Sequence, residues 1–118
     1  MPPTLVQVKR PRNDVGQYDD LAAEWWDPDG AFAMLHWLAK ARSKLVPRAE
    51  SGVLVDVGCG TGLLAPHISG YRHIGVDLVD SALRQAARHG VEPVRADAAR
   101  LPFADGFADV VCAGEILE

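Results

Sequence analysis

The chain has 118 residues, of which 48% are hydrophobic and 24% are charged, and its formal net charge is −4. That length leaves room for one domain, and the composition is that of an ordinary globular protein. The acidic balance argues against a nucleic-acid-binding surface, which is usually basic. No stretch approaches the ~20 apolar residues that a membrane span needs. The two cysteines, Cys59 and Cys112, are expected to be free thiols in a cytoplasmic protein.

The N-terminal part divides into a leader, residues 1–17, and a helical segment, residues 18–48. The leader contains prolines and one basic cluster. We expect it to be a solvated tail and not a signal peptide, because no apolar run follows the charges. In the helical segment, apolar residues recur at helical spacing over 18–26, a turn is predicted at 27–30, and a second helix is predicted over 31–45.

Residues 49–118 alternate between strand and helix patterns. Short apolar runs predict four strands, at residues 53–57, 71–76, 92–95 and 107–112. Between them we predict a short helix over 61–69 and a helix capped by Asp80 or Ser81, and residues 115–118 resemble the first turn of another. This alternation predicts an α/β protein with a Rossmann-like, doubly wound parallel sheet. The chain would hold its N-terminal half, about four strands, and ligands would bind at their carboxyl ends.

A glycine-rich turn follows the first predicted strand. Its glycines are Gly58, Gly60 and Gly62, and Asp56 stands two residues ahead of the first. Such a turn lets a ligand lie against bare backbone at a helix N-terminus. A dinucleotide site requires G-x-G-x-x-G, but Leu63 occupies the position of the third glycine. The spacing instead resembles that of class I methyltransferases, in which no pyrophosphate has to be bound.

Two aspartates end the next two predicted strands. Asp77 lies 19 residues beyond Gly58, close to the spacing at which an acidic side chain accepts both ribose hydroxyls in nucleoside-binding Rossmann folds. Asp97 follows 20 residues later, at the height expected for an adenine amino group. Together with Asp56 and the glycines, these carboxylates predict a nucleoside-binding site at the carboxyl ends of the strands.

Particular segments resemble the ubiquinone-biosynthesis O-methyltransferases, which methylate polyprenylated phenols and catechols. The resemblance covers residues 18–118 and rests on the segment Tyr18-Asp19-Asp20-Leu21-Ala22-Ala23-Glu24-Trp25-Trp26-Asp27-Pro28-Asp29-Gly30, on Phe32, Leu35-His36 and Arg42, on the glycine turn, and on Glu115-Ile116-Leu117-Glu118. It implies an S-adenosyl-L-methionine donor held by Arg42, Gly58, Asp77 and Gly114. It also implies Mg²⁺ or another divalent metal on Glu115 and Glu118, with a histidine after the last residue as the third ligand.

Several residues admit a plainer interpretation. Cys59 lies between glycines without a nearby base, so we expect a small loop residue and not a nucleophile. The tryptophans either form a lid over a prenylated ring or simply pack, and Glu115 and Glu118 either bind metal or favour a helix N-terminus. His36 is expected to be a structural hydrogen-bonding residue. The other histidines are expected at the surface or at strand edges, namely His67, His73 and His89.

The sequence thus predicts a small-molecule methyltransferase that transfers a methyl group to a phenolic oxygen. A lipophilic acceptor would bring peripheral contact with a membrane. The alternatives are a methyltransferase for another small molecule and a non-catalytic donor-binding module. With the strand order 3-2-1-4, the fourth strand would be an edge, and we expect the 118 residues alone to be poorly stable and inactive.

Overall fold

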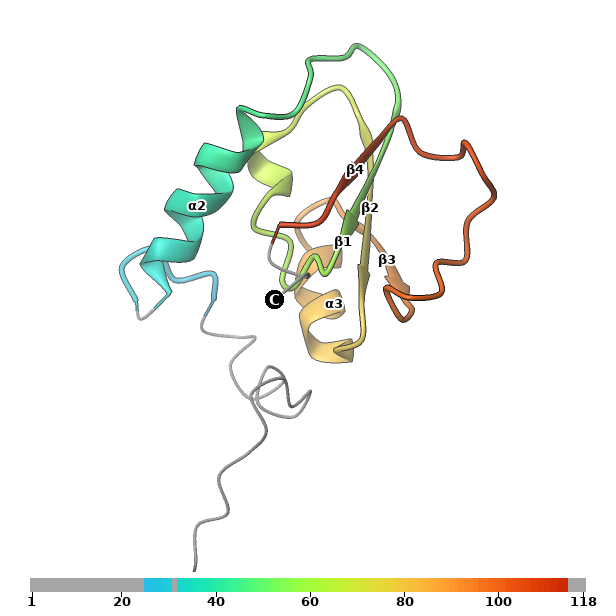
Figure 1. The fold of residues 1–118 in the computed structure, drawn as a ribbon. Helices are drawn as coiled ribbons and strands as arrows, with labels where there is room; N and C mark the ends of the chain where they lie inside the picture. The colour runs from blue at the N-terminus through green and yellow to red at the C-terminus, as the bar shows by residue number, and fades with distance from the viewer. Residues whose placement is uncertain (1–24, 31, 115–118) are drawn as a thin grey trace, which may run out of the picture.

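The computed structural model describes residues 25–30 and 32–114, so the predicted leader lies outside the described residues (Figure 1). Its centre is a four-stranded parallel sheet in the order β3-β2-β1-β4. The strands are β1 (Val53–Val57), β2 (Arg72–Asp77), β3 (Glu92–Arg95) and β4 (Val110–Cys112). This order confirms the predicted Rossmann-like α/β fold, with the N-terminal strands of a doubly wound sheet.

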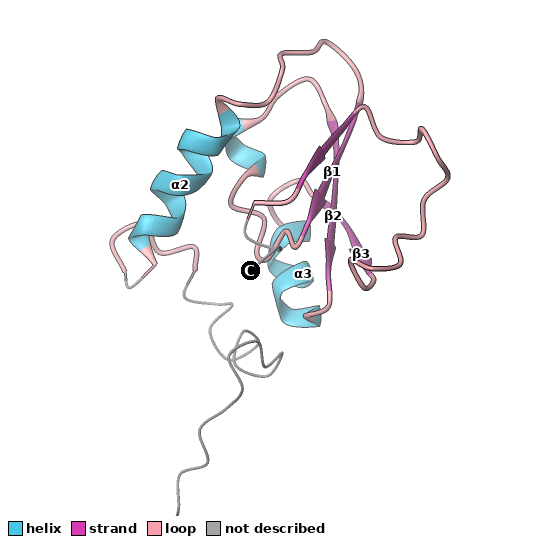
Figure 2. Cartoon of the chain, in the orientation of Figure 1, coloured by secondary structure: helices cyan, strands magenta, loops and turns pink. Residues whose placement is uncertain are grey.

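The helices of the described part lie on one face of the sheet (Figure 2). They are α2 (Ala33–Ser43), the single 3-10 turn η2 (Ala65–His67) and α3 (Asp80–Ala87). The predicted turn before α2 is present, because the Gly30 amide donates to the Asp27 carbonyl at 3.2 Å. Among the described residues, no helix has the length and apolar character needed to cross a membrane.

The helix predicted over 31–45 and the strand predicted over 71–76 are shifted by one or two residues, and three other predictions differ more. The predicted helix over 61–69 is reduced to η2, because the glycine turn occupies its first residues and Pro66 has no N–H to donate. The predicted cap by Asp80 or Ser81 is wrong, since α3 begins after Val79 without a side-chain cap. The fourth strand begins at Val110 and not at Phe107, because residues 107–109 are irregular and follow the turn at Asp105-Gly106.

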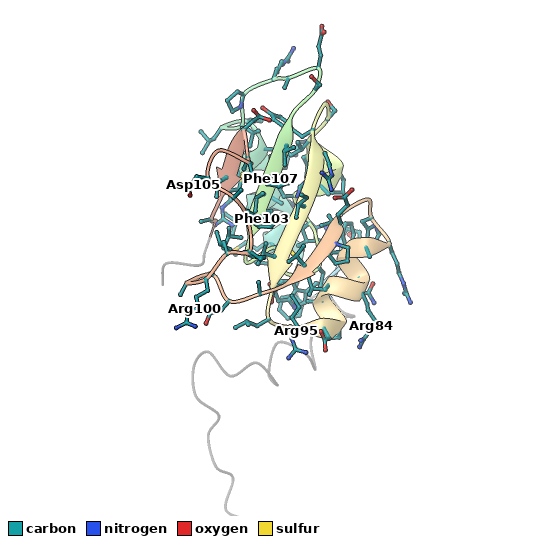
Figure 3. The ribbon with its side chains drawn as sticks, turned by 90° about the vertical axis from the view of Figure 1, so that its right-hand side faces the viewer. Arg84, Arg95, Arg100, Phe103, Asp105 and Phe107 are labelled. Carbon is teal, nitrogen blue, oxygen red and sulfur yellow. The ribbon has the colours of Figure 1, made fainter. Side chains whose placement is uncertain are left out.

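The two larger buried apolar clusters lie on opposite faces of the sheet. On the face away from the helices, Val55, Val57, Ile74 and Val76 form a buried cluster. The irregular segment 96–109 covers this cluster through Phe103 and Phe107 (Figure 3). The rings of these two residues stack with centroids 5.2 Å apart. On the helical face, four residues form the second cluster: Cys59, Leu83, Ala86 and Val91. The first cluster joins β1 to β2, and the second joins α3 to the glycine turn.

Candidate functional site

The glycine turn leaves the carboxyl end of β1 with left-handed backbone at each of its glycines. The φ angles are 72° at Gly58, 55° at Gly60 and 86° at Gly62. Residues with a Cβ rarely adopt this left-handed conformation. The amides of Gly58 and Cys59 both donate to the carbonyl of Val76, at 2.8 and 3.0 Å. The turn is therefore tied to the end of the neighbouring strand β2.

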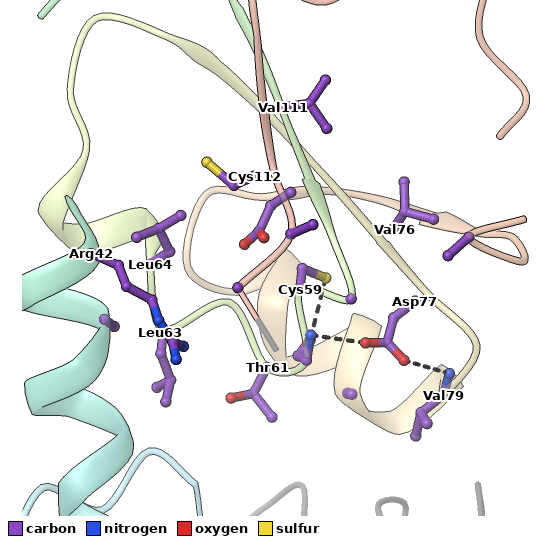
Figure 4. A pocket seen from close by; sticks show the side chains of 18 of the residues that line it. Arg42, Cys59, Thr61, Leu63, Leu64, Val76, Asp77, Val79, Val111 and Cys112 are labelled. Carbon is purple, nitrogen blue, oxygen red and sulfur yellow. Dashed lines mark hydrogen bonds between the residues drawn. The ribbon is translucent and has the colours of Figure 1, made fainter. Parts of the chain in front are cut away.

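A pocket of about 940 Å³ lies between α2, the glycine turn and the carboxyl ends of the strands (Figure 4). Most of the predicted donor-binding residues line it: Arg42, Asp56, Gly58, Gly60, Asp77, Asp97 and Gly114. Gly62 is the exception. A Cβ on Gly62 would lie 3.0 Å from the Ala86 Cα, so its missing side chain makes room for α3 and not for a ligand.

Asp77, the last residue of β2, joins two backbone segments at the pocket wall. Its Oδ2 accepts the Gly60 N–H at 2.9 Å, and its Oδ1 accepts the Val79 N–H at 3.0 Å (Figure 4). Asp97 is more exposed, and its Oδ1 accepts the Ala99 N–H at 2.9 Å. Each carboxylate oxygen has two lone pairs, so Asp77 keeps acceptor capacity for a ligand.

Arg42 and Gly114 meet on the opposite side of the pocket. A Cβ on Gly114 would lie 3.2 Å from Nη1 of Arg42, so the guanidinium lies directly against this glycine. The Arg42 side chain extends from α2 toward the pocket (Figure 4). A cation therefore stands across the pocket from the carboxylate of Asp77.

The site contains buried polar groups that the sequence interpretation missed. His73 is only 7% exposed on β2, and its Nε2 lies 3.7 Å from Oδ2 of Asp56, which is 6% exposed. The prediction of a surface or strand-edge position for His73 is wrong, because the residue shares the covered face of a central strand with Gly75. Thr61 is fully buried in the pocket wall, and its hydroxyl has no partner among the described residues. Residues 73–76 are buried in succession, so both faces of β2 are covered and no polar side chain among them can reach the surface.

The tryptophan pair ahead of α2 reaches the glycine turn. Trp25 lies on the turn, because a Cβ on Gly60 would be 2.6 Å from a carbon of its ring. Trp26 donates from Nε1 to the Thr61 carbonyl at 2.8 Å, and its ring stacks on His89 with centroids 3.4 Å apart. Trp25 therefore lines the pocket, whereas Trp26 packs against the glycine turn and His89.

Two further aromatic side chains differ in their surroundings. Nε2 of His36 is 2.6 Å from the Trp25 carbonyl, a structural hydrogen bond of the kind expected. Trp37 instead lies on the outer face of α2, where it is 72% exposed. Trp25 and Trp26 thus pack on the glycine turn, and Trp37 does not.

The cysteines lie near carboxylates and are poor nucleophiles. Burial raises the pKa of the Cys59 thiol, and the charges of Asp56 and Asp77 raise it further. Burial also raises the pKa of Cys112, with Asp56 as the second cause. Because the thiolate is the reactive form, these shifts favour the structural interpretation of Cys59.

The predicted metal ligands, Glu115 and Glu118, lie outside the described residues. Within residues 25–30 and 32–114, no group of three or more His, Cys, Asp or Glu side chains is arranged to hold a metal ion.

A parallel sheet in this order, with a glycine turn and a pocket at its carboxyl ends, defines a Rossmann-like α/β domain. Residues 55–118 match the family described as a methyltransferase domain. The chain belongs to this methyltransferase domain family.

Known proteins agree with this assignment. The ubiquinone biosynthesis O-methyltransferase of Albidiferax ferrireducens is 38% identical over 122 positions, which cover 89% of this chain and 47% of that protein. The Bordetella parapertussis protein of the same name is 32% identical over 118 positions, which cover 89% and 49%. The chain thus spans about half the length of these curated relatives. A TehB-like SAM-dependent methyltransferase from Corynebacterium glutamicum shares the fold, with a TM-score of 0.63 at 19% identity over 88% of this chain and 58% of that one.

Proposed function

We propose that this chain supplies the donor-binding part of an S-adenosyl-L-methionine-dependent O-methyltransferase. The main support for the proposal is the pocket, which is lined by residues of α2, of the glycine turn and of three strand ends. The glycines leave bare backbone for the donor, and the cation of Arg42 faces the carboxylate of Asp77 across it. A nucleoside that carries an amino-acid carboxylate fits this arrangement, with its hydroxyls at Asp77 and its carboxylate at Arg42.

Each predicted donor contact has a chemical reason. The ribose hydroxyls of the donor can donate to the remaining lone pairs of Asp77, and Asp97 can accept the adenine amino group. The guanidinium of Arg42 can bind the donor carboxylate in a charge-assisted hydrogen bond. When bound, the donor supplies a methyl group that its sulfonium already activates. The protein then has to position the reactants and exclude water, because the displacement disperses charge instead of building it.

We further propose a polyprenylated phenol or catechol as the methyl acceptor. The named relatives support this class, and so does the apolar part of the pocket beneath α2, which is lined by Leu35, Ala39, Leu45, Val46 and Leu64. Such an acceptor partitions into membranes, so the proposal includes peripheral contact with a lipid surface.

A divalent metal on Glu115 and Glu118 remains part of the proposal. In an active form of the enzyme, chelation with EDTA should abolish methyl transfer and leave donor binding nearly unchanged. Transfer that survives chelation would remove the metal from the proposal.

Isothermal titration with S-adenosyl-L-methionine tests the donor assignment. Asp77→Ala removes charge-assisted hydrogen bonds of about 1.5–3 kcal/mol each, so its donor affinity should fall at least tenfold. Asp105→Ala is the matched control, because that aspartate is exposed and does not line the pocket. Equal affinities for the two variants, or preferential binding of NAD, would contradict the assignment. Donor binding without transfer to any phenol in a longer form of the chain would favour a binding module.

A further inference from the structure

The outer face of α2 is an exposed apolar stripe beside positive charge. Met34 is 66% exposed and Trp37 is 72% exposed, one helical turn apart, and Leu45 just beyond the helix is 84% exposed. The inner face of the same helix carries Leu35 and Ala39, which line the pocket. The helix is therefore apolar on two sides, and the described part of the chain covers only one.

The charge of this segment is opposite to that of the whole protein. Residues 31–49 contain four basic residues and no acidic one, in a chain of net charge −4. Arg42 extends toward the pocket, whereas Lys40, Lys44 and Arg48 are exposed. None of these three takes part in an ion pair among the described residues. The positive charge is therefore available next to the apolar stripe.

We infer that the outer face of α2 docks on an anionic lipid surface. A helix that combines exposed apolar side chains with lysines lies in the plane of a membrane interface, where the apolar side chains enter the acyl boundary and the lysines meet the headgroups. Tryptophan is suited to this interface, because its ring is apolar and its indole N–H is polar. Lysine stems also extend along apolar surface while their charges reach the phosphates.

Docking of this face would place the pocket beside the membrane. Leu45 lines the pocket and is also strongly exposed, so it lies where the cavity meets the surface. A lipophilic acceptor could then pass from the bilayer to the cavity without crossing water. This consequence depends on the acceptor class proposed above, whereas the docking itself depends only on α2.

Vesicle binding by the whole chain tests the inference. We expect the protein to cosediment with vesicles of phosphatidylcholine mixed with phosphatidylglycerol, to bind phosphatidylcholine alone weakly, and to be released by salt. Each lysine removed should lower the partition coefficient about fivefold, so Lys40→Gln with Lys44→Gln should lower it about 25-fold. Arg84→Gln with Arg88→Gln is the matched control, because it removes the same charge from exposed positions near α3 and should leave binding unchanged.

Trp37 provides a second measurement that does not depend on charge. Brominated lipids should quench the emission of the native protein, and the Trp37→Phe variant should lose most of that quenching while Trp25 and Trp26 remain. Equal binding by the lysine variant and its control, or no binding to anionic vesicles, would overturn the inference. So would a dimer in solution that Trp37→Ala converts to monomer, since a second copy would then cover this face. None of these readouts requires methyl transfer, so failure of the docking and failure of the proposed function are separable.

Discussion

The contact between Trp25 and the glycine turn predicts that Gly60→Ala is more costly than Gly90→Ala, although both glycines have left-handed backbone. Alanine in the left-handed region costs about 1–2 kcal/mol. At Gly60 the new Cβ would also lie 2.6 Å from a carbon of the Trp25 ring, whereas ordinary carbon contacts are ~3.5–4.0 Å. Overpacking of this kind adds about 1–3 kcal/mol. Gly90 has φ 86°, and a Cβ added there would meet no atom within 4 Å, so Gly90→Ala incurs only the backbone cost.

Urea unfolding followed by far-ultraviolet circular dichroism measures the difference. Gly60→Ala should lower the free energy of unfolding by about 1–3 kcal/mol more than Gly90→Ala does. In a Trp25→Ala background the two glycine substitutions should cost nearly the same, because the clash has been removed. If the two substitutions cost the same with Trp25 present, the ring does not lie on the turn and this account of the site is wrong.

Other substitutions test the packing beneath the site. Gly75→Ala would place a Cβ 2.6 Å from both Cys59 Sγ and Val91 Cγ1, so unfolding experiments should show a loss of about 1–3 kcal/mol that Val91→Ala partly restores. The pKa of Cys59 in the folded protein lies above its unfolded value of 9.0. The buried thiol therefore stabilises the fold below pH 9.0, and this stabilisation is lost as the pH rises beyond that value. The urea midpoint should therefore fall in alkali, less so for Cys59→Ala, and rapid alkylation of the native thiol at neutral pH would argue against the shift. Trp26→Phe removes one hydrogen bond to the Thr61 carbonyl and should cost about 0.5–1.5 kcal/mol, and no change in unfolding would rule out that bond.

The sheet was predictable because short apolar runs mark its strands and glycines or aspartates mark where the strands end. The parallel sheet follows from alternating strands and helices with short crossovers, and the strand order follows from the resemblance to class I methyltransferases. In such a sheet the glycines and aspartates that end the strands meet at one edge. Asp77 and Asp97 therefore reach the predicted pocket, although they are 20 residues apart in the chain. Arg42 and Gly114 also meet, as the family resemblance implied.

Features that depend on tertiary packing were not predictable from local pattern. Gly62 belongs to the same motif as Gly60, yet it contacts α3, because the motif does not reveal which side of a turn a helix occupies. His73 is hidden since a histidine in a strand gives no sign of which face is covered. The fourth strand is short because the Asp109 side chain accepts the Val53 N–H at 2.7 Å, an interaction between residues 56 positions apart.

The shared carbonyl of Val76 has a consequence for ligand binding. Two successive amides of the glycine turn donate to this one oxygen, so the turn keeps its shape before any ligand arrives. A flexible glycine loop would lose conformational entropy on binding, whereas this turn has lost that entropy already during folding. The free energy of each ligand contact is then available for affinity, and little of it is consumed in ordering the backbone that makes the contact.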